Sequence, residues 1–290
     1  MQIEFMASLK EIKSRIQSVK STQKITSAMK MVSSAKLRKA QKTIENFFPY
    51  EQRLTGLLNN FLSSAEDASS VYAEKREVKK VAIIVFSSNS SLCGSFNSNV
   101  IKRLSQVIDK YQGLGKEDIL IFPVGKKISK ACLKYGFEPQ GNFEAMADKP
   151  TYAATVLLSD EIMNLFSAKQ VDKVELIYHH FKSKSSQVLL DETYLPIPLQ
   201  PSKKGALALD YIVEPDRNTL IADLIPRVLR LKIYTALLDS NALEHAARTM
   251  AMQIATDNAT DLLQELSLQY NKSRQQAITN ELLDLVGGSF

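Results

Sequence analysis

The stretch SLKEIKSRIQSVKSTQKITSAMKMVSSAKLRKAQKTI, residues 8–44, repeats an apolar side chain every three or four positions over about ten helical turns. Ser8 and Glu11 have the S-x-x-E spacing of a capping box, which indicates that a helix begins here. The pattern predicts one long amphipathic helix whose apolar stripe must be covered by another part of the protein. The stripe comprises Leu9, Ile12, Ile16, Val19 and, after a slip of the repeat, Ile25, Met29, Val32, Leu37, Ala40, Ile44 and Phe47.

The other end of the chain carries a second stripe of the same kind. From Pro226, taken as a first-turn residue, to Val286 it predicts a helix of about 90 Å, too long for a globule about 50 Å across. Two such helices flanking a folded middle are expected to pair as an antiparallel coiled coil; packing in ordinary helical bundles is the alternative. The stripe comprises Val228, Leu231, Leu238, Ala242, Ala259, Leu263, Leu266, Tyr270 and Ala277, before Gly287 and Gly288.

Strand-like and helix-like segments alternate in the middle of the chain. The apolar run VAIIVF at 81–86 is typical of a strand that is buried on both faces. We therefore expect an α/β fold with a Rossmann-like, mostly parallel sheet covered by helices and a hairpin at its edge. Further strands are expected at 119–124, 173–180 and 188–195, and helices at 100–111, 126–135 and 152–166. The expected domains are an N-terminal helix at 6–64, an α/β domain at 78–200 and a C-terminal helix at 216–290.

Composition indicates a folded protein without a membrane-spanning segment. Hydrophobic residues make up 44% and charged residues 23%, and no apolar run approaches the length of about 18 residues that a membrane span needs. Residues 1–20 carry charges where a signal peptide would be apolar. Cys93 and Cys132 match no disulfide framework or zinc pattern, so reduced thiols are expected.

Charge is distributed unevenly along the chain. Residues 7–44 hold ten lysines and arginines against the single acid Glu11, whereas acids slightly outnumber bases from residue 219 onward. This difference favours pairing of the two helices and provides a basic flank for an acidic partner; a solvated lysine face is the alternative. No aromatic residue lies between Lys10 and Lys42, so any contact with nucleic acid would be weak and salt-sensitive, and none is expected.

The middle domain carries no recognisable catalytic pattern. The loop after the first strand has only Gly94, so it is neither a dinucleotide-binding turn nor a phosphate loop. Cys93 has no evident base beside it, and a buried structural thiol is the simpler interpretation. His179 and His180 are adjacent on a strand and point to opposite faces, so they cannot share a metal. We expect no catalytic residue, no cofactor and no metal site.

Both ends of the chain resemble a known family. MASLKEIKSRIQSVKSTQKITSAMKMVSSAKLRKAQ, residues 6–41, resembles the N-terminal helix of the gamma subunit of F-type ATP synthases. EHAARTMAMQIATDNATDLLQELSLQYNKSRQQAITNELLDLVGG, residues 244–288, resembles that family's C-terminal signature. The middle matches more loosely, through the first strand and the loop SLCGSFNSN at 91–99, and Ser87–Ser91 departs from the family's charged-and-glycine turn. The chain lacks the cysteine-bearing insertion of the chloroplast forms, so a bacterial protein is expected.

The resemblance implies a central rotor stalk. In the family, proton flow turns a ring of c subunits, and the stalk turns with it inside a ring of alpha and beta subunits, whose beta sites perform the catalysis. The expected partners are therefore the alpha and beta subunits, the epsilon subunit and the c ring, with no direct membrane insertion. The expected location is the cytoplasmic face of the bacterial inner membrane, as a peripheral protein. A coiled-coil scaffold whose basic helix binds acidic partners, and an α/β enzyme with helical arms, are the competing interpretations.

Residue-by-residue match to the family also implies a set of partner contacts. Lys30 could pair with an acidic loop of the beta subunit, and the C-terminal positions are implicated in coupling and in hydrogen bonds to beta; a solvated helix face is the alternative for each. The alanines between 242 and 259 either allow close helix approach or simply favour helix. The apolar tip at 282–286 either enters a sleeve in the ring or caps the coiled coil. The contact residues are Met29, Lys30, Arg248, Gln275, Thr279 and Glu281.

Overall fold

The computed structural model describes residues 9–63, 70–181, 187–197, 213–214 and 216–287. The chain divides into two compact units, one made of Met1–Ser34 with Arg248–Phe290 and the other of Ala35–Ala247. We call them the coiled-coil unit and the globular unit and describe each by itself. The expected capping residue, Ser8, lies outside the described residues.

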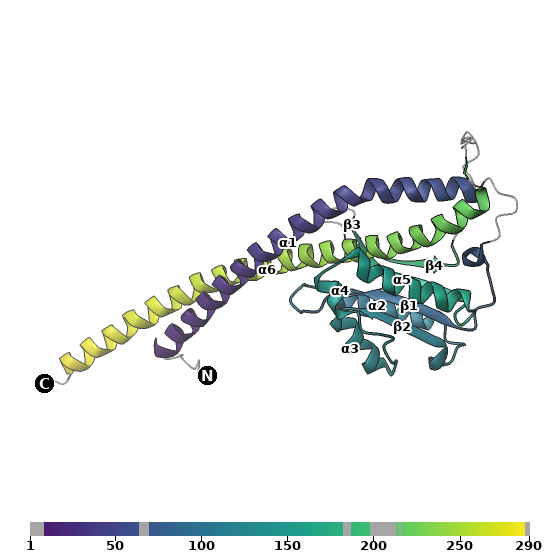
Figure 1. The fold of residues 1–290 in the computed structure, drawn as a ribbon. Helices are drawn as coiled ribbons and strands as arrows, with labels where there is room; N and C mark the ends of the chain where they lie inside the picture. The colour runs from purple at the N-terminus through teal and green to yellow at the C-terminus, as the bar shows by residue number, and fades with distance from the viewer. Residues whose placement is uncertain (1–8, 64–69, 182–186, 198–212, 215, 288–290) are drawn as a thin grey trace. The chain divides into compact units, whose positions relative to one another are not determined.

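Two long helices run through both units, as the apolar stripes predicted (Figure 1). Helix α1 spans Leu9–Ser63 and continues through Pro49, and helix α6 spans Arg217–Gly287. Helix α6 begins within the expected segment 216–290, so Pro226 lies inside the helix and not in its first turn. The carboxylate of Asp216 accepts hydrogen bonds from the backbone N–H of Thr219 (2.9 Å) and from its hydroxyl (2.6 Å), as a helix N-cap does.

The globular unit is built on a four-stranded sheet of order β2-β1-β3-β4. Strands β1 (Val81–Phe86), β2 (Ile119–Val124) and β3 (Lys173–Phe181) are parallel, and β4 (Gln187–Leu195) pairs antiparallel with β3. This arrangement confirms the mostly parallel sheet with a hairpin edge. Every residue of β1 is buried, as expected for a central strand covered on both faces.

Helices cover both faces of the sheet. On one face, α2 (Phe96–Asp109) and α3 (Lys126–Tyr135) pack against Val81, Ile83 and Val85. On the other, α5 (Tyr152–Ser167) and the adjoining parts of α1 and α6 pack against Ala82 and Ile84. The helices α3 and α5 lie where the sequence predicted them, whereas α2 begins at Phe96 and not at residue 100. The short helices α4 (Glu144–Asp148), η1 (Val71–Ala73) and η2 (Lys116–Asp118) were not expected.

Candidate functional site

In the coiled-coil unit, α1 and α6 lie side by side and run antiparallel (Figure 1). Residues 12, 16, 19, 23, 26, 30 and 33 of α1 follow one another at alternating steps of four and three, and all are buried or partly buried. On α6 the buried Met252, Ala259 and Leu266 follow one another at steps of seven residues. A strict seven-residue repeat is the pattern of a two-stranded coiled coil, so the expected pairing is confirmed.

The middle of this seam is polar. The side-chain amide of Gln23 donates to the hydroxyl of Thr260 at 2.8 Å, and the hydroxyls of Thr26 and Thr256 lie 2.8 Å apart. One turn further along α1, the ammonium of Lys30 donates to Oε1 of Gln253 at 2.7 Å. Residue numbers rise on α1 as they fall on α6, which fixes the antiparallel direction. We call these six residues the polar seam.

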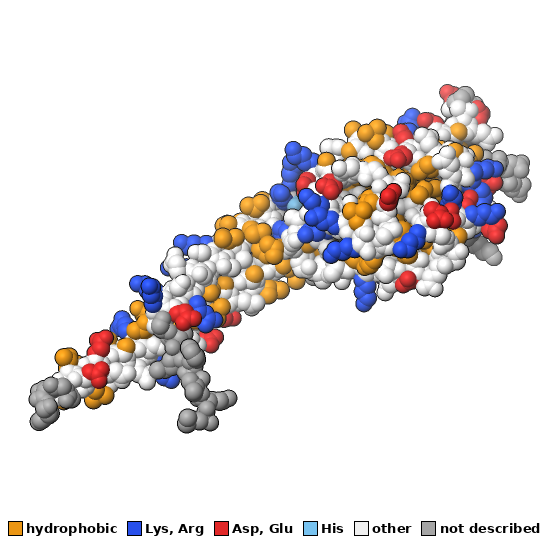
Figure 2. Space-filling view, turned by 90° about the horizontal axis from the view of Figure 1, so that it is seen from below, with side chains coloured by type: hydrophobic (Ala, Val, Ile, Leu, Met, Phe, Trp, Pro, Cys, Tyr) orange, Lys and Arg blue, Asp and Glu red, His pale blue; other side chains and the backbone are white. Residues whose placement is uncertain are grey.

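The expected slip of the repeat in α1 is wrong, because the repeat continues through polar residues. Ile25 and Val32, which were placed on the stripe, are 59% and 57% exposed, whereas Thr26 and Ser33 are only 8% and 3% exposed. Apolar Met250 and Ile254 of α6 also face outward at this level. Hydrophobic side chains therefore reach the surface of the coiled-coil unit, as Figure 2 shows for one of its faces.

We predict that the polar seam lowers the stability of the coiled coil. Replacing both Thr26 and Thr256 with valine should raise the free energy of unfolding by about 1 kcal/mol, because a heptad core gains more from apolar contact than from exchanged hydroxyls. Urea unfolding followed by circular dichroism measures the change. Thr22→Val, on the exposed side of α1, is the matched control; a double variant less stable than the wild type would contradict the prediction.

All six predicted partner-contact residues lie in the coiled-coil unit, but they form two groups. Met29 and Lys30 are partly buried beside the polar seam, and Arg248 is buried five residues before Gln253 on α6. Gln275, Thr279 and Glu281 are exposed and lie about 33–42 Å further along the helix axis, at 1.5 Å per residue. The structure thus places the first three within about two helical turns of one another and does not join the last three to them.

The side chains of these residues are not equally available to a partner. The ammonium of Lys30 is already hydrogen-bonded within the coiled coil, and Arg248 is only 7% exposed. The hydroxyl of Thr279 donates to the backbone oxygen of Gln275 at 2.9 Å, so its hydrogen is used within α6. Gln275 and Thr279, four residues apart, share one face of the helix, whereas Glu281 lies on another. Sequence reasoning missed Gln23, Thr26 and Gln253, of which an unbroken heptad count would have found the first two.

The C-terminal end of α6 is apolar and exposed. Leu282, Leu283, Leu285 and Val286 are 58–72% exposed within the described chain. When the pairing of the polar seam is continued along both helices, Leu9, the first described residue of α1, lies opposite about residue 274. In the part of the chain that the structure describes, this tip therefore lies past the paired region, which argues against its capping the coiled coil.

Three of the alanines of α6 pack closely in the globular unit. Ala242, Ala246 and Ala247 are 0–7% exposed and share a hydrophobic cluster with Leu37 of α1 and Phe96 of α2. Small side chains are needed where two helices and a loop meet at close range. For these three positions the structure favours close approach over mere helix propensity.

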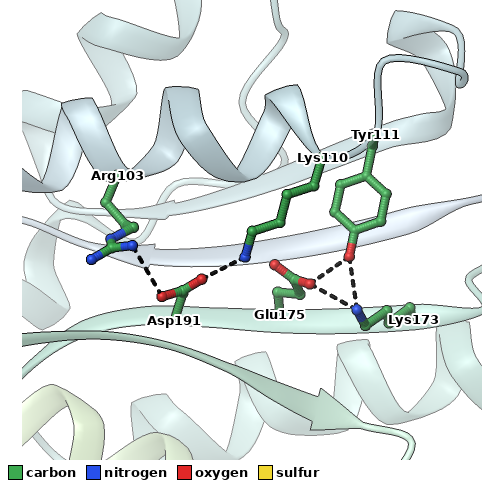
Figure 3. A network of polar contacts seen from close by, with 6 residues as sticks. All are labelled: Arg103, Lys110, Tyr111, Lys173, Glu175 and Asp191. Carbon is green, nitrogen blue, oxygen red and sulfur yellow. Dashed lines mark hydrogen bonds and ion pairs between the residues drawn. The ribbon is translucent and has the colours of Figure 1, made fainter.

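The polar cluster most like an active site lies between α2 and strands β3 and β4 (Figure 3). Glu175 is 5% exposed, and its carboxylate accepts hydrogen bonds from the hydroxyl of Tyr111 and from the ammonium of Lys173 at 2.9 Å. Beside it, Asp191 pairs with Lys110 at 2.6 Å and Arg103 at 3.5 Å. Because each carboxylate is paired with a cation within the fold, the cluster joins α2 to the sheet edge, although Oε2 of Glu175 is buried without a hydrogen-bond partner in the described chain.

The protonation states in this cluster are fixed by their surroundings. Burial, followed by the hydrogen bond to Glu175, raises the pKa of Tyr111 to about 12, so the phenol keeps its proton at neutral pH. Burial alone would lower the pKa of Lys173, but hydrogen bonds to Tyr111 and Glu175 raise it. The neutral phenol and the charged ammonium can therefore both donate to the carboxylate.

Removing the phenol should weaken the globular unit. Tyr111→Phe leaves Glu175 with Lys173 as its remaining donor among the described residues, and the expected loss in the free energy of unfolding is about 2 kcal/mol, since the lost hydrogen bond is to a charged group. Urea unfolding measures it. Tyr135→Phe, at an exposed residue, serves as control. If the free energy of unfolding fell no further in Tyr111→Phe than in the control, the hydrogen bond between Tyr111 and Glu175 would make no net contribution to stability.

Two adjacent histidines of the globular unit lie on opposite faces of the sheet, and its two cysteines are buried. His179 is 1% exposed and stacks on Phe96 with ring centroids 4.2 Å apart, whereas Nδ1 of His180 lies 2.7 Å from Asp239 of α6. The two rings thus face opposite sides of the sheet, as predicted. Burial lowers the pKa of His179 to about 4, so it is neutral at physiological pH. Cys93 and Cys132 are buried free thiols, and burial raises the pKa of Cys132 to about 11.

None of the described helices is long and apolar enough to cross a membrane. A family profile described as ATP synthase matches residues 8–289. The chain is 58% identical to the ATP synthase gamma chain of Phocaeicola vulgatus and 60% identical to that of Bacteroides fragilis, each over 288 residues that cover 98% of this chain and 99% of the relative.

Solved structures share the fold at low sequence identity. The chain is similar to a chain of the rotor of the Euglena gracilis mitochondrial ATP synthase, with a TM-score of 0.64, 19% identity, and 93% of this chain and 98% of that one covered. It is also similar to a chain of the Tetrahymena thermophila mitochondrial central stalk and c ring, with a TM-score of 0.58, 22% identity, and coverages of 80% and 99%. At these identities the likeness concerns the fold alone.

Proposed function

This chain belongs to the family of ATP synthase gamma chains, and from that membership we propose that it is the central rotor stalk of an F-type ATP synthase. In this role it couples proton flow through a ring of c subunits to the synthesis or hydrolysis of ATP on a ring of alpha and beta subunits. The chemistry takes place on the beta subunits, and the stalk transmits torque. The observation that carries the proposal is the coiled-coil unit, in which two helices distant in the sequence are paired in one continuous heptad.

The asymmetry of this unit supports a rotor. A single antiparallel pair of helices has no threefold symmetry, so three identical partners around it meet different side chains at any instant. The α1 side exposes Lys13, Lys20 and Lys24, whereas the α6 side exposes Asp257 and Asp261. A binding partner shifts a subunit toward the conformation that it contacts most favourably. Because the stalk contacts the three identical subunits unequally, it can shift each of them toward a different conformation. Rotation of the stalk then moves those contacts from one subunit to the next.

The six partner-contact residues fit this role in different ways. Gln275, Thr279 and Glu281 are exposed on α6 and can meet a surrounding subunit directly. Met29 and Lys30 lie beside the polar seam, so a beta subunit would meet the ammonium of Lys30 only together with Gln253. We assign Arg248, which is buried, to holding the coiled coil in the form that the ring recognises. The globular unit would contact the epsilon subunit and the c ring.

The proposed location is the cytoplasmic face of the bacterial cell membrane, as a peripheral protein. The absence of an apolar spanning helix among the described residues is compatible with attachment through the c ring alone. In a bacterium the alpha and beta ring lies on the side where ADP and ATP are found. The membrane association would therefore be lost when the c ring is removed.

Affinity capture of the tagged full chain from its own bacterium tests the proposal. The rotor role requires recovery of alpha and beta subunits in a ratio of three each to one stalk, together with ATP hydrolysis that depends on the captured beta subunits. The competing scaffold role, suggested by the basic face of α1, requires self-association or capture of other acidic proteins without that ratio. Recovery of the chain without alpha and beta subunits would refute the rotor role.

A further inference from the structure

A cavity of about 290 Å³ lies inside the globular unit, between the second half of α1, strands β3 and β4, and α6. This volume is near the lower end of the range, about 300–1,000 Å³, that small-molecule sites occupy. Apolar walls are provided by Phe48, Leu58, Val228 and Leu229. The cavity is separate from the coiled-coil unit, and nothing in the rotor role requires it.

Carboxylates predominate among the charged groups that face this cavity. Glu51, Glu192 and Asp239 line it, against the single permanent cation Lys232 and the titratable His180. Glu192 is held by Lys232 at 3.4 Å, and Asp239 by Nδ1 of His180 at 2.7 Å. Glu51 differs, because its Oε1 accepts a hydrogen bond from the hydroxyl of Thr55 at 3.1 Å and no basic side chain in the described chain forms an ion pair with it.

The three carboxylates converge on one phenol. Tyr178 donates to Oε1 of Glu192 at 3.1 Å, and its pKa is raised by burial first, then by Glu192, Asp239 and Glu51. These carboxylates come from α1, β4 and α6 and line the same cavity. A cation placed there would be attracted by all of them, and the aromatic faces of Tyr178 and Phe48 suit a cation or an apolar ring equally well.

A further polar atom in the cavity wall has no partner. The hydroxyl of Thr235 on α6 is buried and makes no hydrogen bond within the described chain, even to the backbone of its own helix. Buried hydroxyls almost always find a partner, because an unmatched one costs about 1–3 kcal/mol. A lone hydroxyl that lines a cavity is therefore available as an acceptor for an N–H group of a ligand.

We propose that this cavity is a binding site for a small organic ammonium ion with a compact apolar body. The ammonium would lie among Glu51, Glu192 and Asp239, with Glu51 supplying the carboxylate that has no resident cation. The hydroxyl of Thr235 would accept one of its N–H groups, and the apolar body would lie against Phe48, Val228 and Leu229. The site discriminates by charge, so a neutral or anionic ligand of the same shape binds less well.

Titration of the full chain with three ligands of one shape tests the proposal. The probes are 2-phenylethylamine, which is cationic at neutral pH, 2-phenylethanol, which is neutral, and 3-phenylpropionate, which is anionic. Saturation-transfer NMR and calorimetry should show the amine binding at least about tenfold more tightly than either analogue, the ratio expected for one charge-assisted hydrogen bond. Equal binding of all three, or no binding of the amine at millimolar concentration, would refute the site.

Two variants with opposite expected effects locate the binding. Glu51→Gln should weaken amine binding about tenfold, and Lys232→Met should strengthen it, because the resident cation is removed. Glu45→Gln, an exposed glutamate of α1 outside the cavity, should change nothing. Circular dichroism confirms that each variant is folded. Amine binding that is unchanged by both Glu51→Gln and Lys232→Met lies elsewhere and overturns the proposal, whatever the outcome of the subunit-capture experiment.

Discussion

Replacing Arg248 with glutamate is expected to lower ATP synthesis by the assembled enzyme about tenfold or more, while alpha and beta subunits still assemble around the stalk. Arg248 is only 7% exposed, at the start of the α6 segment that belongs to the coiled-coil unit. Reversal of its charge places a carboxylate where a guanidinium is accommodated, next to the level at which Lys30 and Gln253 hold the two helices together. The change therefore disturbs the surface that the ring meets at this level.

ATP synthesis by membrane vesicles under a proton gradient measures the effect, and co-purified alpha and beta subunits measure assembly. Arg274→Glu makes the same charge change at an exposed position of α6 and should leave synthesis within about twofold of the wild type, as for most surface substitutions. Arg248→Lys keeps the charge and should retain part of the activity. If Arg248→Glu reduced assembly as much as synthesis, Arg248 would be a residue of general stability and not of coupling.

Replacing Ala242 with phenylalanine is expected to destabilise the globular unit by about 3 kcal/mol or more. Ala242 is fully buried in the cluster that also contains Leu37, Cys93 and Phe96, so α1, the loop before α2, and α6 meet at its methyl group. A benzyl group there has no space unless one of these elements moves. Because protein interiors are packed as densely as organic crystals, such movement disturbs neighbouring contacts as well.

Urea unfolding of the full chain, followed by circular dichroism, measures this loss. Ala222→Phe, at an exposed position of the same helix, accounts for the lower helix propensity of phenylalanine, which is about 0.5 kcal/mol. The difference between the two variants is the packing effect. A difference below about 1 kcal/mol would mean that the cluster yields easily and that the alanines serve helix formation only.

The sheet could be predicted well from the sequence because its signal is local and strong. The run VAIIVF at 81–86 has no polar residue, and only a strand covered on both faces accommodates such a run. The helices predicted between the strands favoured parallel neighbours, and the few residues between the strands expected at 173–180 and 188–195 favoured an antiparallel edge. The start of α2 at Phe96 was missed, because Asn97, Ser98 and Asn99 are weak helix formers that tertiary contacts hold in place.

The candidate contact residues came from resemblance, and their surroundings could not be predicted from sequence. Hydropathy placed Ile25 and Val32 on the seam and gave no position for Thr26, whereas the structure exposes the first two side chains and buries Thr26. The hydroxyl of Thr26 donates to the backbone oxygen of Gln23 within α1 at 3.0 Å, and its contact across the seam is with Thr256, which lies 230 residues away in the sequence. A pattern read along one helix has no access to that partner.

The sequence by itself indicated two long helices with apolar stripes, a mostly parallel sheet between them and a preference for pairing the two ends of the chain. Those features follow from periodicity, which is a local property of the backbone and its side chains. Tertiary structure decided which side chains occupy the seam, which carboxylates share the cavity of the globular unit and which arginine is buried. These depend on partners far apart in the sequence, because polar groups become stable inside a protein only when a matching group is brought to them.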